Sequence, residues 1–218
     1  MKMNKNGFTL VELLIVIALI AILSVAVLAT INPIEQTNKA RDAKVQNDAA
    51  EVLSAYERYY ASKNSYPWLD LMDDETDTVD AAFFSKANEA GFGLCTNASA
   101  TTKNDLCTTS TTPGALVTSD ELKSSFLNKE YTIIGANYKP ENTLFLIKQS
   151  STAGNNIYVC FVPKAKVNRT NTAGFKLKAL TITNGLPTTI VDATDQQIID
   201  ATYATVTDNV SLFRCVPQ

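Results

Sequence analysis

The chain has 218 residues, with 19 lysines and arginines against 22 aspartates and glutamates, so its formal net charge is −3, and it contains no histidine. This mild acidity gives no electrostatic footprint for nucleic acid, and we expect no nucleic-acid partner. The lack of histidine removes the commonest general base and metal ligand. No nucleophile elbow or phosphate-binding loop is present either. We therefore expect no catalytic residue, no cofactor and no bound metal.

An apolar tract at residues 8–31 is the first distinctive element, and Glu12 is its only charged residue. A run of about 20 apolar residues can cross the hydrocarbon core of a bilayer as a helix. A charged side chain deep in such a helix costs roughly 2.5–3.5 kcal/mol on insertion scales and is usually functional. Glu12 lies near the start of the tract, after a short leader that carries Lys2 and Lys5 and ends in Gly7. We predict a membrane-spanning helix whose acid has a function.

Residues 7–12 read Gly-Phe-Thr-Leu-Val-Glu and are followed by Leu-Leu-Ile-Val-Ile-Ala-Leu-Ile-Ala-Ile-Leu. This motif resembles the N-terminus of the type IV pilin and pseudopilin family. The resemblance implies cleavage between Gly7 and Phe8 by a prepilin peptidase, on the cytoplasmic side, and then methylation of the new Phe8 amine. It also implies that Glu12 pairs with the N-terminal amine of a neighbouring subunit as subunits leave the inner membrane for a helical filament.

The chemistry of the Phe8 amine and Glu12 supports such a pairing, but other readings remain. A free α-amine has a pKa of about 7.7–8.0 and is largely charged at neutral pH. An ammonium and a carboxylate that are buried together are costly to separate, so a bundle of helices that buries both favours one axial register. The same two residues are four apart and could instead pair within one chain. The tract could also be a signal peptide, cleaved near residues 27–29, or an uncleaved anchor.

A second helical stretch is expected to follow the tract. Asn32-Pro33 closes the tract, and because proline disrupts a helix we expect a kink or opening near residues 30–33. From residue 34 the pattern becomes amphipathic, with an expected helix end at Lys63–Asn64. The apolar stripe needs a partner, which we expect to be a β-sheet. It consists of Val45, Ala49, Val52, Leu53, Tyr56, Tyr59 and Tyr60.

Residues 65–130 have the character of a variable connecting region with short helices. An acidic run at residues 70–80 suits a solvated loop better than a calcium site, because it lacks the EF-hand spacing. We expect one short helix near residues 79–90, stopped by Gly91. A second is expected to open at the capping box formed by residues 118–121 and to reach Leu127.

The last part of the chain predicts an antiparallel β-sheet. Strands are predicted at residues 131–135, 143–148 and 157–163, and a fourth is expected at residues 175–183. A short helix near residues 195–201 and a final extended segment to the last cysteine complete the chain.

The four cysteines, Cys95, Cys107, Cys160 and Cys215, all follow the apolar tract. An even number in an exported domain predicts disulfides, with three connectivities open. Cys95 and Cys107 bracket a Thr/Ser-rich loop, whereas Cys160 in a central strand and Cys215 near the terminus suit a bridge that pins the tail to the sheet. We therefore favour 95–107 with 160–215. In the family that the chain resembles, such a disulfide-bounded C-terminal loop forms an exposed patch of the filament.

These patterns together predict an α+β fold, in which a long N-terminal helical spine packs against an antiparallel sheet. The expected divisions are a leader (1–7), a transmembrane and filament-core helix (8–33), an amphipathic half of the spine (34–64), a connecting region (65–130) and a sheet with a disulfide-bounded C-terminal region (131–218).

The function implied by the resemblance is a structural subunit of a type IV pilus-like filament that serves adhesion, motility or DNA uptake. Its partners would be other copies of the chain, the prepilin peptidase and an inner-membrane assembly platform. The subunit would lie in the inner membrane before assembly and on the cell surface afterwards. Two alternatives stay open: a pseudopilin of a type II secretion system, and a minor tip pilin acting as an adhesive module, which the Thr/Ser-rich insertion favours.

Overall fold

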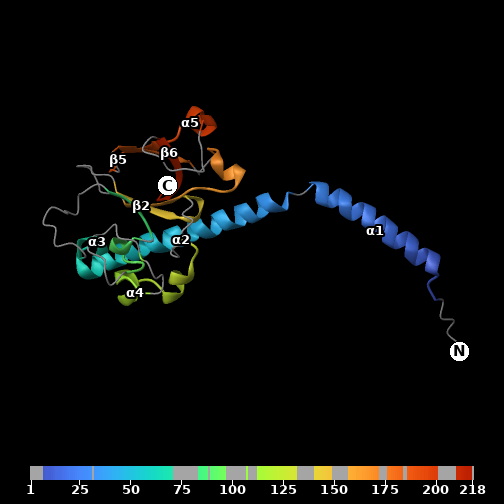
Figure 1. The fold of residues 1–218 in the computed structure, drawn as a ribbon, viewed down its shortest axis with the longest axis horizontal. Helices are drawn as coiled ribbons and strands as arrows, with labels where there is room; N and C mark the ends of the chain where they lie inside the picture. The colour runs from blue at the N-terminus through green and yellow to red at the C-terminus, as the bar shows by residue number, and fades with distance from the viewer. Residues whose placement is uncertain are drawn as a thin grey trace.

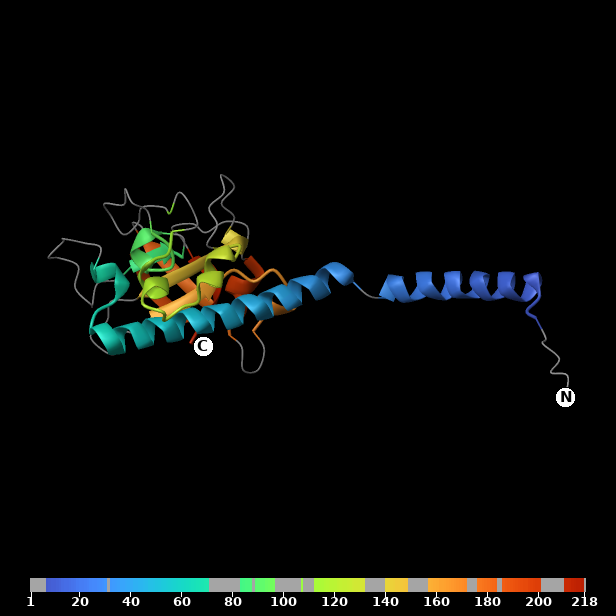
Figure 2. The same ribbon diagram turned by 90° about the horizontal axis from the view of Figure 1, so that it is seen from below.

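The computed structural model describes residues 7–30, 32–70, 83–87, 89–96, 107, 112–131, 140–148, 157–171, 176–183, 186–200 and 210–217. Two long helices follow one another and lead into a head in which the second helix lies against a β-sheet (Figures 1 and 2). The first helix projects away from this head in both views. The α+β fold class predicted from the sequence is confirmed.

The two long helices are α1, Leu10–Thr30, and α2, Pro33–Lys63. Asn32 between them is extended, with φ −89° and ψ 97°, and its Oδ1 accepts a hydrogen bond from the Glu35 N–H at 3.2 Å. Proline suits the first position of a helix, where no N–H donor is needed, but it cannot continue a preceding helix. The break expected near residues 30–33 is therefore confirmed, and Asn32 starts a new helix immediately after it.

The end of α2 also lies where the sequence predicts it. Asn64 adopts a left-handed conformation with φ 55°, and its N–H donates to the Tyr60 carbonyl at 2.8 Å. Asparagine tolerates this conformation better than most residues, so it is a common helix C-cap. The chain then turns away from the spine into the short helix α3, Pro67–Asp70.

Six strands of the described residues form one antiparallel sheet in the order β1-β2-β3-β6-β4-β5. They are β1 Phe83–Lys86, β2 Leu144–Lys148, β3 Ile157–Phe161, β4 Lys178–Thr183, β5 Leu186–Asp192 and β6 Val210–Val216. The last strand joins the two halves of the sheet, because Val210 to Phe213 pair with β4 and Arg214 to Val216 pair with β3. Strands predicted at residues 143–148, 157–163 and 175–183 correspond to β2, β3 and β4.

The sheet is covered on both faces. Leu144 and Leu146 of β2 belong to one core with most of the apolar stripe of α2, namely Val45, Ala49, Val52, Tyr56 and Tyr59, while Leu53 packs at its edge. Tyr60 was expected in this stripe but is exposed. The alternate residues Phe145 and Ile147 face a second core with Phe213 of β6. All five residues of β2 are consequently buried. A strand covered on both faces shows a continuous apolar run in place of alternation.

The remaining described elements are short. They are the helices α4 Ala115–Thr118 and α5 Asp195–Asp200, and the 3-10 turns η1 Ala90–Phe92, η2 Ser124–Asn128, η3 Pro140–Asn142 and η4 Lys166–Arg169. The helix expected near residues 195–201 is α5. The acidic run after Asp70 and the strand expected after Tyr131 lie outside the described residues.

The helix predicted over residues 79–90 is wrong in its described part, because Phe83–Lys86 form β1. Phe84 lies opposite Ile147 in the antiparallel pairing with β2. The Phe84 ring also stacks on Phe145, with 5.3 Å between the ring centroids. Tertiary pairing and burial of this kind override a local helical pattern.

The capping box predicted to open a helix at residue 118 is also wrong. Thr118 is the last residue of α4, and its hydroxyl donates to the carbonyls of Gly114 and Ala115 at 3.2 Å. Asp120, with φ 61°, then turns the chain. The same Ser/Thr/Asp residues that cap helix starts also form turns, and here they end the helix.

Candidate functional site

The helix α1 is exposed to solvent at every residue from 10 to 28. Residues 10–28 are long and apolar enough to cross a membrane, and none of them is buried in the structure. The large apolar side chains of this stretch range from 45% exposed at Val16 to 79% at Leu10. Patches of this size on a soluble surface mark sites of protein or membrane contact. A cleaved signal sequence can have the same length and composition as this stretch. The residues at the start of α1 must therefore distinguish a signal sequence from a membrane or assembly helix.

Glu12 closes a capping box at the start of α1. Thr9 is the N-cap, because its carbonyl accepts the Leu13 N–H at 3.2 Å. Glu12 Oε2 accepts the Thr9 N–H at 2.9 Å and the Thr9 hydroxyl at 2.8 Å, and the Glu12 N–H donates to Thr9 Oγ1 at 3.3 Å. Residues 9–12 spell Thr-x-x-Glu, which is the sequence signature of this motif. Our sequence reasoning missed it and considered only Phe8 as a partner within the chain.

The capping box explains how one acid is tolerated at the edge of an apolar helix. Its carboxylate accepts the Thr9 N–H and the Thr9 hydroxyl and lies at the positive end of the helix dipole. Both bonds from Thr9 reach Oε2, and Glu12 Oε1 has no hydrogen-bond partner within the described part of the chain. One carboxylate oxygen is therefore available to a group from outside.

Gly7 and Phe8 precede this cap and are open to the surroundings. Phe8 is 83% exposed. A Cβ built on Gly7 would meet no atom within 4 Å. The folded chain itself therefore sets no steric demand for glycine at this position. Any requirement for glycine must come from a molecule that binds there.

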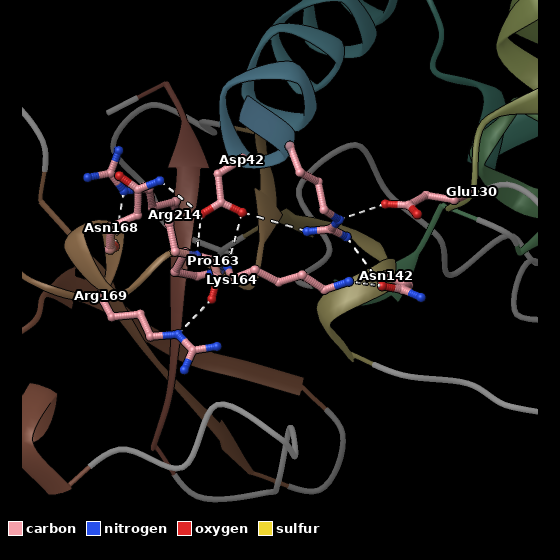
Figure 3. Close-up of polar contacts among 10 residues, drawn as sticks. Asp42, Glu130, Asn142, Pro163, Lys164, Asn168, Arg169 and Arg214 are labelled. Carbon is pink, nitrogen blue, oxygen red and sulfur yellow. Dashed lines mark hydrogen bonds and ion pairs between the residues drawn. The ribbon is translucent and has the colours of Figure 1, made fainter. Parts of the chain in front are cut away.

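A second polar cluster joins the spine to the head (Figure 3). Asp42 of α2 is only 1% exposed. Its Oδ1 accepts the Lys164 N–H at 3.0 Å, and its Oδ2 accepts the Ala165 N–H at 2.9 Å and Asn168 Nδ2 at 2.8 Å. A buried carboxylate is stable only with several such donors. Asp42 thereby holds the loop that follows β3 against the spine.

Arg41 and its neighbours extend this cluster towards the connecting region. Arg41 Nε lies 2.8 Å from Glu130 Oε1, and Asn142 Oδ1 accepts Lys164 Nζ at 2.7 Å. Arg214 of β6 donates to the Asn168 carbonyl at 3.3 Å. Burial lowers the pKa of Arg214, although the nearby Asp42 carboxylate acts in the opposite direction. The cluster has structural character, because every described group in it binds another part of the chain (Figure 3).

Two disulfides complete the head. Cys95 is bonded to Cys107, and Cys160 is bonded to Cys215. Cys160 and Cys215 are directly opposite each other in the pairing of β3 with β6. The second bridge therefore ties the last strand to the centre of the sheet. Within the described ranges, no group of three or more potential ligands could hold a metal ion.

Residues 2–28 match a family model described as the prokaryotic N-terminal methylation motif. Searches of the curated proteins and of the solved structures give no significant match to the chain. The motif is the signature of type IV pilins and pseudopilins, so the resemblance noted in the sequence is confirmed. Long N-terminal helices followed by an antiparallel sheet are consistent with a pilin-like fold. The motif supports a type IV pilin-like or pseudopilin protein, and the apolar helix fits an inner-membrane-anchored precursor.

Proposed function

We propose that the chain is a structural subunit of a type IV pilus-like filament. Residues 1–7 are the leader, which a prepilin peptidase removes between Gly7 and Phe8, and the new Phe8 amine is then methylated. Subunits pass from the inner membrane, through an assembly platform, into a filament on the cell surface. The observation that carries this proposal is the fully exposed apolar α1, whose only acid is capped locally and has one free oxygen.

The free oxygen of Glu12 suggests how one subunit joins the next. In the membrane, lipid covers α1 and Thr9 satisfies the acid. In the filament, the α1 helices of other copies replace the lipid, and Glu12 Oε1 receives the Phe8 amine of a neighbouring subunit. The pair holds the helices in one register because leaving either charge buried alone is costly.

Two substitutions at Glu12 separate the ion pair from the helix cap. Glu12→Val removes both, whereas Glu12→Gln keeps an acceptor oxygen for Thr9 and removes the charge. We expect mature subunit in the membrane but no surface fibres from either variant, as seen by electron microscopy of sheared cells. Glu57→Gln, a change at an exposed acid of α2, should leave fibres intact. Normal fibres from Glu12→Gln would refute the pairing.

Processing is tested separately at Gly7. Gly7→Val should leave the chain at its full precursor mass, because the peptidase needs a residue without a side chain at this position. Mass spectrometry of the membrane fraction measures this directly. Since the folded chain has room for a side chain at residue 7, a loss of cleavage would reflect the peptidase and not misfolding. An unchanged mature mass would argue against cleavage after Gly7.

The methylation motif favours one second candidate, a pseudopilin of a type II secretion system, because such proteins carry the same signature. A pseudopilin works as a piston and rarely forms long fibres. Deletion of the chain would then abolish export of secreted enzymes and leave surface fibres unchanged. Fibre imaging combined with a secretion assay on the same deletion strain separates the two functions.

A further inference from the structure

The end of the head nearest α1 is built from the first turns of α2 and from the turn η4. Glu35 Oε1 accepts the Val167 N–H at 3.5 Å, which places η4 beside the first turn of α2. Asp42 holds the start of the same loop two turns further along the helix. The turn η4, drawn in orange, accordingly lies on the α1-facing end of the head (Figure 1). These contacts fix its level along the spine.

This end of the head meets the membrane surface when α1 spans the bilayer. The apolar stretch from Leu10 to Leu28 has 19 residues. They make about 29 Å of helix, which matches a hydrocarbon core of about 30 Å. The headgroup layer adds roughly 5–8 Å on each side. Ile34 follows Leu28 by about 9 Å of helical rise, so the first turn of α2 reaches the outer edge of that layer.

Apolar side chains are exposed at this level of the spine. Ile34 is 71% exposed and Val167 is 45% exposed. Among the described residues after α1, the other large apolar side chains that are exposed are Tyr60 and Val191. Two of these four side chains therefore belong to the small part of the head that is nearest the membrane span.

Two lysines border the exposed apolar side chains. Lys166 is exposed next to Val167. Lys39 lies one turn after Glu35, on the flank of α2 that faces the η4 loop. Helical side chains incline towards the helix N-terminus, which directs Lys39 towards α1. Neither lysine has a hydrogen-bond or ion-pair partner among the described residues. The two acids of this flank, Glu35 and Asp42, accept backbone N–H groups of the loop.

We propose that this end of the head is a docking surface for anionic lipid headgroups, on the face of the membrane from which the head emerges. The surface, which we call the lipid-docking patch, consists of Ile34, Lys39, Lys166 and Val167. Exposed apolar side chains flanked by lysines are typical of segments that lie in a membrane interface. The patch continues the apolar surface of α1, and its cations complement anionic headgroups. The inference rests on the membrane-anchored precursor of the proposed function.

Dye labelling of the full chain tests the docking. The native cysteines are all in disulfides, so Thr170→Cys provides one free thiol for a fluorescent dye. The Thr170 hydroxyl donates to the Val167 carbonyl at 2.9 Å, so the dye lies beside the patch. The chain is reconstituted at low density in vesicles of phosphatidylcholine, alone or mixed equally with phosphatidylglycerol. Quenching by acrylamide should be roughly two-fold weaker in the anionic vesicles, because the docked head shields the dye. High salt should remove this protection.

A dye at the far end of α2 is the positional control. Glu57→Cys carries the dye at an exposed residue about 35 Å from Ile34 along the helix, and its quenching should be the same in both vesicles. Equal quenching of the residue 170 dye in the two vesicles would overturn the inference. So would protection that depends on protein density and not on lipid charge, because a second copy would then cover the patch.

Neutral substitutions test the lysines themselves. Each lysine at an anionic surface favours the docked state by about five-fold, so Lys39→Gln with Lys166→Gln should abolish the difference between the two vesicles. The matched variant Lys63→Gln with Lys123→Gln removes the same charge from exposed positions elsewhere on the head and should keep the difference. Equal behaviour of the two variants would overturn the role of the patch.

A dye in α1 separates this inference from the proposed function. Leu19→Cys lies near the middle of the apolar stretch, and its dye should be protected in both vesicles when α1 spans the bilayer. Protection at residue 19 without protection at residue 170 would overturn the docking alone. A residue 19 dye that acrylamide reaches freely would overturn the membrane-anchored precursor, and the proposed function with it.

Discussion

Two kinds of acid lie on the helix α2. Asp42 and Asp48 are 1% and 7% exposed, whereas Glu51 and Glu57 face solvent. Asp48 receives hydrogen bonds from Lys129 Nζ, at 3.1 Å, and from the Tyr131 hydroxyl. The bonds to Asp42 come from the loop after β3. Both buried acids therefore hold distant parts of the chain against the spine, and the exposed acids remain available to other molecules.

Replacing Asp42 is the strongest test of this division between structural and exposed acids. Asp42→Ala leaves two backbone N–H groups and one side-chain amide without their acceptor, and we expect a loss of roughly 3–5 kcal/mol in the free energy of unfolding. Chemical denaturation of the full chain in detergent measures it. Glu57→Ala, an exposed acid on the same helix, should change this quantity by less than about 0.5 kcal/mol. Similar effects from the two variants would show that the Asp42 cluster does not stabilise the fold.

Glu89 gives a prediction for pH dependence. Burial raises the pKa of Glu89 above its ordinary value of 4.5, although Lys86 opposes the shift. The folded chain therefore binds this proton more tightly than the unfolded chain. The contribution of Glu89 to stability is full below pH 4.5 and is lost as the pH rises through the raised pKa.

Glu89→Gln should accordingly flatten the fall in stability between acidic and neutral pH, measured by denaturation across a pH series. Asp192→Asn serves as a control, because its effect on the pH dependence of stability should have the opposite sign. Hydrogen bonds from Lys178 and Lys176 lower the pKa of Asp192, so its contribution is lost as the pH falls. A Glu89→Gln profile parallel to that of the wild type would contradict the assignment.

At the scale of elements, the joint between α1 and α2 is set by two residues. Pro33 cannot continue α1, and Asn32 caps α2 through the Glu35 N–H. Asn32→Ala with Pro33→Ala should let one helix run through the joint. Spin labels at residues 24 and 54 should then show one distance of about 45 Å, the length of 30 helical residues. The wild type should depart from this value, and Asn47→Ala, within α2, should resemble the wild type.

The two disulfides should differ in their contribution to stability. The bridge between Cys160 and Cys215 closes a separation of 55 residues, against 12 for Cys95 and Cys107. In the chain-entropy model, these loops correspond to about 4 and about 3 kcal/mol. Replacing each pair by alanines should therefore lower the melting temperature more for 160–215, as scanning calorimetry would show. The reverse order would mean that strain or residual structure outweighs loop closure.

At the scale of the whole molecule, the chain separates into a rod and a head (Figure 2). None of residues 10–28 is buried, and the buried cores belong to α2 and the parts of the chain that follow it. The free energy that folds the head therefore owes nothing to the packing of α1. The exposed apolar surface of α1 fits contact with lipid, and in the proposed filament other copies of the chain would cover it.

A fragment of residues 32–218 should consequently be monomeric without detergent and should melt within a few degrees of the full chain. Gel filtration and thermal denaturation measure both properties. The full chain should require detergent or lipid, because it exposes large apolar residues from Leu10 to Leu28 of α1. Aggregation of the fragment, or a much lower melting temperature, would show that the head depends on α1.

Much of the two long helices could be predicted from the sequence, because the signals for them are local. The apolar tract, the break at Asn32-Pro33 and the amphipathic pattern to Lys63 depend only on neighbouring residues. The motif around Gly7, Phe8 and Glu12 is local as well. The Thr9 cap was readable in the same way, although it was overlooked.

Tertiary structure alone decided the arrangement of the head. Residues 83–86 became a strand because β2 offered a partner, and residues 118–121 ended a helix that they were expected to begin. The burial of Asp42 and the place of β6 between β3 and β4 depend on which surfaces meet. That Lys44 and Glu51 have no ion-pair partner among the described residues could likewise be seen only after folding, because a sequence lists charges but does not show which of them the fold brings together.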